Sequence, residues 1–477
     1  MFFNSLSFAL FLPLVFVLYW FVFNKTKSSQ NAILILASYY FYSCWDWRFL
    51  FLLVFSTFLD YYTGIQIEKA KSENSRKFWF WLSISMNLGF LGIFKYYNFF
   101  ADSFSQLLNG FGLQTSPLLL NVVLPVGISF YTFHGLSYVI DIYLKRIKAE
   151  YNFVDYSLFV SYFPLLVAGP IERATHLLPQ VKVKRSFNYQ KAKEGIYQFI
   201  WGLLKKVVIA DTCATYANAI FDHYESMNSL SLILGAVYFA FQIYGDFSGY
   251  SDMALGMSKL FGIDLLRNFN YPYFSRDIAE FWRKWHISLS SWFRDYVYIP
   301  LGGSSGGIGM KIRNTFIIFL VSGFWHGANW TFIAWGFINA LYFLPLLLLN
   351  KNRSNMETVS LQWHLSSVRV FLNILSTFAL TCLAWIFFRA KSIGDAFDYI
   401  KRMFLDLSFD SQYLENERYN YELLLLILAF VLVEWNSRTQ IEPISGRYSW
   451  LKLTFCLAAI VALGTYSDYK EFIYFQF

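Results

Sequence analysis

Long apolar stretches recur along this chain, and they constrain its fold more than any other feature. A helix needs about 20 apolar residues to cross the hydrocarbon core of a bilayer. Such runs lie near 5–23, 31–43, 47–66, 78–100, 118–143, 230–245, 314–349, 366–388, 419–435 and 449–466. The pattern predicts roughly ten to twelve spans, and therefore a multi-pass membrane protein.

Helices are the expected scaffold of these spans. A backbone in hydrocarbon must satisfy its own hydrogen bonds, and the runs lack the apolar and polar alternation of a membrane barrel. Only 15% of the 477 residues are charged, compared with about 25% in soluble proteins. We therefore expect an all-α polytopic helical bundle that forms a single domain over residues 1–477.

One apolar run does not fit simple span counting. Basic clusters flank residues 153–171 on both sides, at 145–148 and 182–193, so a full crossing would put one cluster on the wrong side of the membrane. Pro164, Gly169 and Pro170 would end a helix partway across. The sequence predicts a re-entrant element here that lines a cavity.

The stretch FWRKWHISLSSWFRDY contains the first of two notable histidines, His286. On a 3.6-residue wheel, Trp282, Trp285, Leu289 and Trp292 share one arc, and His286 lies at its edge. This pattern predicts one amphipathic helix that lies flat at the membrane interface. By spacing alone, two roles are open for His286. It is either a hydrogen-bonded residue of an aromatic belt at the membrane interface or a residue that takes part in the chemistry.

The second histidine, His326, lies in SGFWHGANWTF within a longer apolar stretch. An ionisable group in such a stretch usually has a function. Burial disfavours the charged imidazolium, so His326 would stay neutral and able to accept a proton, as a general base must. A hydrogen bond to a neighbouring helix is the competing explanation.

Other residue patterns exclude several kinds of site. The four cysteines are far apart, with no C-x-x-C spacing and no histidine at ligand distance, so we expect no metal site. The net charge is +8, and the Lys and Arg residues lie in short loops between spans. Short loops of this kind stay on the cytoplasmic side of the membrane, which explains the charge without a nucleic-acid partner. Asp246 and Asp252 in GDFSGYSD resemble a carboxylate pair, but the surrounding small residues also fit a helix contact.

Six motifs taken together resemble those of bacterial membrane-bound O-acyltransferases of the alginate O-acetyltransferase type. They occur in order along most of the chain from about residue 40, and are densest in 120–345. The motifs are VLPVGISFYTFHGLSYVIDIY, FPLLVAGPIERATHLLPQ, DFSGYSDMALG, FWRKWHISLSSWFRDYVYIPLGG, GFWHGANWTFIAWG and FIYFQF.

The resemblance implies re-entrant and interfacial helices around a central tunnel, with His326 as the catalytic histidine and His286 as the second motif histidine. It also implies a thioester donor on the cytoplasmic side, acetyl-coenzyme A in the acetylating branch, and an acceptor hydroxyl on the far side. No permanently bound cofactor is implied. We expect His326 to be the general base and Trp325 or Asn329 to donate to the developing oxyanion.

Further residues are expected along the substrate path. Arg283, Arg276 and Lys284, together with the loop lysines on the inner side, would attract the phosphates of the donor. The enrichment of cytoplasmic loops in Lys and Arg explains the same charges without a ligand. The substrate channel is expected to include Trp325, Asn329, Asp246, Trp282, Arg283, Gly169 and Pro170.

Two other functions remain open at this point. Related enzymes attach D-alanine to teichoic acid from a carrier protein, and a transporter or flippase would also have many spans. The motif forms favour the acetylating branch in a bacterial inner membrane. That branch implies a polysaccharide acceptor and an extracytoplasmic partner transferase of the SGNH type.

Overall fold

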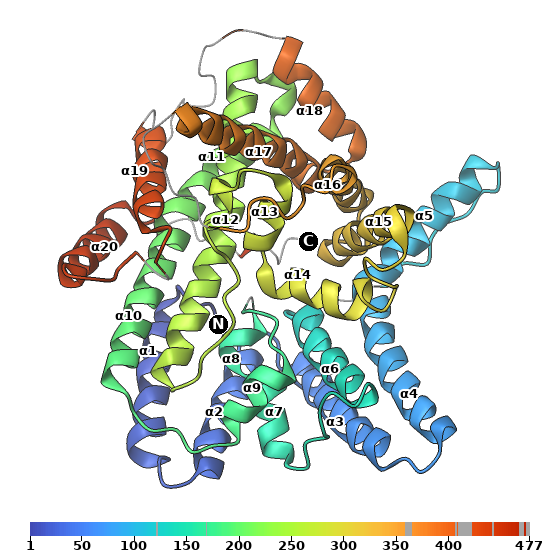
Figure 1. The fold of residues 1–477 in the computed structure, drawn as a ribbon, viewed down its shortest axis with the longest axis vertical. Helices are drawn as coiled ribbons and strands as arrows, with labels where there is room; N and C mark the ends of the chain where they lie inside the picture. Colours follow the sequence, from blue (N-terminus) through green and yellow to red (C-terminus); the bar gives the residue numbers. More distant parts are fainter. Residues whose placement is uncertain are drawn as a thin grey trace. The chain divides into compact units, whose positions relative to one another are not determined.

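The structure, a computed structural model, describes residues 1–120, 123–167, 169–357, 365–405, 408, 422–440, 443–466 and 472–473. Every regular element in these ranges is a helix, as Figure 1 shows, and the all-α prediction is confirmed. The chain divides into two compact units. Unit 1 comprises Met1–Ile196 and Ala254–Leu266, and unit 2 comprises Tyr197–Met253 and Arg267–Phe477.

Several helices are long and apolar enough to cross a membrane, which confirms the polytopic prediction. Within the described ranges there are six such segments, and Leu6–Val22 and Ser449–Leu463 are shorter apolar helices. The six are α3 (Trp47–Lys69), Glu73–Gly110, α12 (Ser229–Leu260), α15 (Gly307–His326), α16 (Trp330–Leu348) and Val368–Arg389 within α17 (Leu365–Arg389).

Unit 1 is built around α3, which packs against α4 (Glu73–Leu91) and α6 (Ile128–Tyr143). The carboxylate of Asp60 on α3 is buried and accepts hydrogen bonds from Ser83 and Asn87 on α4. Gly135 on α6 leaves room for this carboxylate, because a Cβ there would collide with it. The remaining helices of the unit are α1 (Leu6–Val17), α2 (Lys27–Ser43), α5 (Tyr97–Gly110), α7 (Phe153–Ser161), α8 (Phe163–Leu166), α9 (Ala174–Val181) and the first half of α10 (Tyr189–Leu204).

The run 153–171 forms two short helices, α7 and α8, in place of a span. The nine residues of α7 extend only about 14 Å, less than half of the hydrocarbon thickness of about 30 Å. The chain breaks at Tyr162, and Pro164 lies in the first turn of α8. Residues 155–167 are buried, and such burial is what irregular backbone at membrane depth requires.

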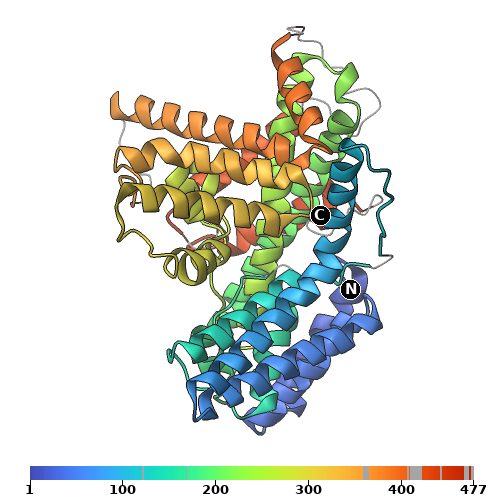
Figure 2. The same ribbon diagram turned by 90° about the vertical axis from the view of Figure 1, so that its right-hand side faces the viewer.

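Unit 2 contains the three neighbouring helices α15, α16 and α17. Only residues 327–329 connect α15 to α16, so these two helices are antiparallel neighbours; α17 packs on α16, as Figure 2 shows. The other helices of the unit are the second half of α10, most of α12, α11 (Asp211–Asp222), α13 (Ile278–Lys284), α14 (Ile287–Phe293), α18 (Ile393–Leu405), α19 (Glu422–Ser437) and α20 (Ser449–Leu463).

Two glycines bring the backbones of α15 and α16 into direct contact. A Cβ added to Gly323 would collide with the carbonyl oxygen of Phe332, and one added to Gly336 would collide with that of Phe319. Small residues allow this close approach between membrane helices. The contact lies one turn before His326 and therefore fixes the end of α15 against α16.

Candidate active site

The predicted single helix over residues 282–296 is wrong, because the chain breaks at His286. Helix α13 ends at Lys284, and α14 begins at Ile287. Between them His286 has φ 45° and ψ 54°, a left-handed conformation that is uncommon for a residue other than glycine. Such backbone strain persists only where the surrounding structure imposes it.

A loop upstream imposes this conformation. The carbonyl oxygen of Asn268 accepts a hydrogen bond from the Ile287 N–H at 2.9 Å, and the Asn270 N–H donates to the carbonyl of Lys284 at 3.0 Å. The side-chain Oδ1 of Asn268 also accepts from the Ser288 N–H at 3.2 Å and from the Ser288 hydroxyl at 2.7 Å. Asn268 therefore holds the α14 side of the break, and Asn270 holds the α13 side.

The same amide determines which nitrogen of His286 carries the proton. A backbone N–H can only donate, so the Asn268 atom that faces Ser288 must be the oxygen. That oxygen lies 3.2 Å from Nδ1 of His286, and two acceptors would not form a hydrogen bond. We therefore assign the neutral tautomer with a proton on Nδ1, which leaves Nε2 as a hydrogen-bond acceptor.

The surroundings of His286 favour this neutral form. Its side chain is 1% exposed, and its ring packs edge-on against Phe247 with centroids 4.6 Å apart. Burial lowers the pKa of His286 to about 3. The imidazole is therefore uncharged at neutral pH.

His326 is the last residue of α15 and is 3% exposed. Its ring lies among aromatic rings, with centroids 4.9 Å from Trp325, 5.1 Å from Trp335 and 5.4 Å from Phe388. Its centroid is 6.5 Å from that of His286. The structure thus brings together two histidines that are 40 positions apart in the sequence.

Both histidines line one cavity of about 740 Å³ in unit 2. On α15 the lining follows one face of the helix, from Lys311 through Thr315 and Ser322 to His326. Fifteen residues of helix correspond to about 22 Å, so the cavity is long. Apart from the histidines, its lining residues are Ala279, Trp282, Arg283, Leu289, Ser290, Phe293, Arg294, Tyr298, Ser304, Lys311, Thr315, Ile318, Phe319, Ser322, Phe343, Leu347, Asn350, Asn352, Arg353 and Met356.

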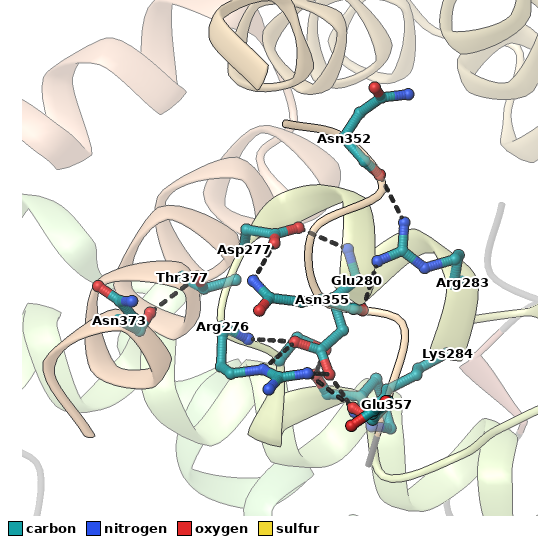
Figure 3. Close-up of polar contacts among 12 residues, drawn as sticks. Arg276, Asp277, Glu280, Arg283, Lys284, Asn352, Asn355, Glu357, Asn373 and Thr377 are labelled. Carbon is teal, nitrogen blue, oxygen red and sulfur yellow. Dashed lines mark hydrogen bonds and ion pairs between the residues drawn. The ribbon is translucent and has the colours of Figure 1, made fainter. Parts of the chain in front are cut away.

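Trp282 and Arg283, both expected on the substrate path, line this cavity. The indole N–H of Trp282 donates to Asn339 on α16 at 3.3 Å. The guanidinium of Arg283 donates to the backbone carbonyls of Asn352 and Asn355, each at 2.8 Å, as Figure 3 shows. Arg283 therefore ties the segment after α16 to α13.

The two expected oxyanion donors differ in their surroundings. Trp325 is buried, and its ring lies near both histidines, with centroids 6.0 Å from His286 and 4.9 Å from His326. Asn329 instead caps α16, since its Oδ1 accepts from the Thr331 N–H at 3.0 Å and its Nδ2 donates to the carbonyl of Lys391 at 3.2 Å. Neither residue is among those that line the cavity.

Asp246 also lies outside the cavity lining. Its Oδ1 pairs with the ammonium of Lys206 at 2.9 Å, and Lys206 also pairs with Asp211 at 2.8 Å. Its Oδ2 accepts from the backbone N–H of Ile473 at 2.7 Å. Phe472 and Ile473, the two described residues of the FIYFQF motif, are buried. Asp246 therefore belongs to a buried ion cluster that also binds the backbone of Ile473.

Gly169 and Pro170 belong to unit 1, whereas every lining residue of the cavity belongs to unit 2. Both are buried. A Cβ on Gly169 would lie 2.6 Å from the carbonyl oxygen of Pro164, so the close turn after α8 requires glycine.

Sequence reasoning missed several residues of the site. Lys311, Thr315 and Ser322 occur at helical spacing before His326, and this periodicity could have identified them as neighbours on one face. Asn268 gave no such signal, because it is 18 positions from His286 and no periodic pattern connects the two.

Comparison with known proteins agrees with this geometry. A sequence profile of the membrane-bound O-acyltransferase family matches residues 144–388. The chain is 39% identical to the probable alginate O-acetylase AlgI of Pseudomonas aeruginosa over 83% of this chain and 73% of the relative. It is 36% identical to the peptidoglycan O-acetyltransferase of Helicobacter pylori, over 82% of this chain and 77% of the relative.

A more distant relative is named for the transfer of a different acyl group, D-alanine. The chain is 26% identical to the teichoic acid D-alanyltransferase of Bacillus subtilis over 57% of this chain and 70% of the relative. The profile covers both motif histidines and all lining residues of the cavity. The chain therefore belongs to the membrane-bound O-acyltransferase family, and it is a multi-pass membrane O-acyltransferase.

Proposed function

We propose that this enzyme moves an acetyl group from acetyl-coenzyme A in the cytoplasm to a hydroxyl of an extracytoplasmic polysaccharide or of a partner protein, with His326 as the general base. The observation that carries this proposal is that two buried histidines line one long cavity with a cationic residue at its opposite end. The similarity to alginate and peptidoglycan O-acetyltransferases supports the acetyl group and the polysaccharide acceptor.

The distribution of charge supports the orientation. Lys311 and Arg313 lie at the start of α15, Lys351 and Arg353 follow α16, and Arg369 lies near the start of α17. Because these helices are antiparallel neighbours, the five cations gather at one end of the helix group. Short cytoplasmic loops are enriched in Lys and Arg, so this end faces the cytoplasm and the donor enters there, in the inner membrane of a bacterium.

In the reaction we propose, an imidazole nitrogen of His326 takes the proton of the acceptor hydroxyl. The hydroxyl oxygen attacks the thioester carbonyl, the C–S bond breaks, and the thiolate leaves and recovers a proton from His326. A positioned general base typically contributes about a hundredfold to ten-thousandfold in rate. Burial of the site keeps water from the activated acyl group.

The other residues have supporting roles in this proposal. Asn329 caps α16, whereas the ring of Trp325 lies beside both histidines. We therefore retain Trp325 as the donor to the oxyanion, although it is not among the residues that line the cavity. Nε2 of His286 is an acceptor in the assigned tautomer, and it would accept a hydrogen bond from an amide N–H of the donor's pantetheine arm. His286 would then orient the thioester toward His326.

We also propose that a separate extracytoplasmic transferase of the SGNH type completes the transfer to the polysaccharide. Transfer of D-alanine from a carrier protein is the second candidate, and the teichoic acid D-alanyltransferase relative supports it. The acetylating relatives have the higher identities and match more of this chain, which favours acetyl transfer.

The test is acetyl transfer from radiolabelled acetyl-coenzyme A by the purified enzyme with its partner transferase. His326→Gln should lower the rate by about a hundredfold or more while the protein stays folded and monodisperse. His223→Gln is the matched control, because His223 lines a different pocket and should have no effect. Undiminished transfer by a folded His326→Gln variant would remove His326 from the mechanism.

A further inference from the structure

The lining of the active-site cavity is strongly cationic. It includes Arg283, Arg294, Lys311 and Arg353, and within the described part of the chain it includes no Asp or Glu. Like charges gathered around one cavity create a positive potential that attracts anions. The lining therefore suits a ligand with several negative charges.

The basic residues near the cavity divide into two groups. Arg276 and Lys284 pair with the carboxylate of Glu280, at 2.9 and 2.7 Å, and Arg283 is bonded to two backbone carbonyls (Figure 3). All three residues therefore have partners within the protein.

The second group is available to a ligand. Lys311 and Arg353 have no carboxylate partner among the described residues. Arg294 is exposed, and it pairs through Nε with Asp295 at 2.7 Å. The three cations come from different parts of the chain: the π-helical turn after α14, the first turns of α15, and the loop after α16.

The arrangement along α15 relates these cations to the histidines. Lys311 and His326 share the lining face of the helix and are about 22 Å apart along its axis. Coenzyme A has the matching layout, because a diphosphate and a 3′-phosphate lie at one end and the thiol lies at the end of an extended arm. A carrier protein also presents a pantetheine arm, but that arm has a single phosphodiester and no nucleotide.

We propose that Lys311 and Arg353, assisted by Arg294, bind the phosphates of a free coenzyme A thioester, and that the enzyme thereby selects this donor over a carrier-protein thioester. The inference rests on the proposed function, since it takes the acyl end of the donor to lie at His326. The 3′-phosphate is the group that separates coenzyme A from a carrier-bound arm.

The test measures the affinity of the full-length enzyme, in nanodiscs, for coenzyme A and for 3′-dephospho-coenzyme A. The wild type should prefer coenzyme A. Lys311→Ala and Arg353→Ala should each weaken coenzyme A binding by about tenfold or more, the usual effect of losing a charged hydrogen bond. At least one of these substitutions should abolish the preference for the 3′-phosphate, and added salt should weaken wild-type binding.

Lys351→Ala is the matched control, because Lys351 lies in the same loop as Arg353 but outside the cavity lining. It should bind coenzyme A as the wild type does. Wild-type affinity in both Lys311→Ala and Arg353→Ala would overturn the inference, and so would tight binding of a pantetheine-loaded carrier protein without binding of coenzyme A.

His326→Gln separates this inference from the proposed function. The variant should keep its affinity for coenzyme A and lose acetyl transfer. Transfer that persists in His326→Gln contradicts the proposed base but does not contradict the phosphate site. Transfer that requires His326 while neither Lys311 nor Arg353 affects binding contradicts the phosphate site alone.

Discussion

The imidazole rings of His286 and His326 lie with their centroids 6.5 Å apart and their planes at 61°. His286 is the left-handed residue between the short helices α13 and α14, and His326 is the last residue of the 20-residue helix α15. Both line the same cavity. Their mutual position therefore depends on two separate supports, and each support can be tested on its own.

Asn268 supports His286, so Asn268→Leu should lower acetyl transfer by about tenfold, because it removes the acceptor of the Nδ1 proton. Asn268→Asp keeps an acceptor oxygen and should retain most of the activity. The added negative charge should raise the pKa of His286, and the pH–rate profile should shift upward accordingly. Equal activity of the Leu variant and the wild type would show that Asn268 does not position His286.

His286 should make the stability of the enzyme depend on pH. Its folded-state pKa is about 3, below the ordinary value of 6.5, so only the unfolded chain takes up a proton between these values. The stabilising contribution is thus complete above about pH 6.5 and is lost progressively as the pH falls toward 3. Thermal unfolding in detergent at pH 7.5, 6 and 5 should show a smaller pH dependence for His286→Gln than for the wild type.

Gly323 supports His326 through the contact between α15 and α16. Gly323→Ala should force the two helices apart and lower both the unfolding temperature and the rate, because its Cβ would collide with a backbone carbonyl. Gly309→Ala is the matched control on the same helix. No atom lies within 4 Å of a Cβ at Gly309, and alanine there should stabilise the helix by up to about 1 kcal/mol. Identical behaviour of the two variants would contradict the close contact.

The buried cluster of Lys206, Asp211 and Asp246 should act on stability. Lys206→Met leaves two buried carboxylates without their ammonium partner and should cost about 3–5 kcal/mol in the free energy of unfolding. Lys391→Met should change little, since the side chain of Lys391 is 75% exposed. Denaturant unfolding measures both effects.

Asp246→Asn separates the structural role of Asp246 from its expected place in the substrate channel. The variant should be less stable, yet the folded fraction should retain its turnover. Normal stability combined with lost turnover would instead support a place for Asp246 in the substrate channel.

Much of the fold follows from the sequence because the bilayer leaves few choices. Apolar runs near 20 residues must form helices, and the run 47–66 predicted α3 correctly. The run 230–245 covers only the first half of α12, and the run 314–349 is divided between α15 and α16 at residues 327–329. The stretch 153–171 was also recognisable as an interrupted segment, since proline and glycine limit helix length.

The break at His286 was not predictable from local sequence. Trp285, His286 and Ile287 are all compatible with a helix, and the wheel over 282–296 has a consistent apolar arc. The left-handed turn is imposed by main-chain hydrogen bonds from Asn268 and Asn270, which are tertiary contacts. The structural partners of Asp246 and Asn329 were not predictable for a similar reason, because a polar side chain in an apolar stretch fits a structural partner as well as a substrate.

The backbone contact at Gly323 and Gly336 has a consequence for how this enzyme can diversify. Since α15 meets α16 through main-chain atoms, the position of His326 at the end of α15 does not depend on the bulk of the side chains around it. A lining residue such as Phe319 can then change size, and so alter the room in the cavity, without moving His326.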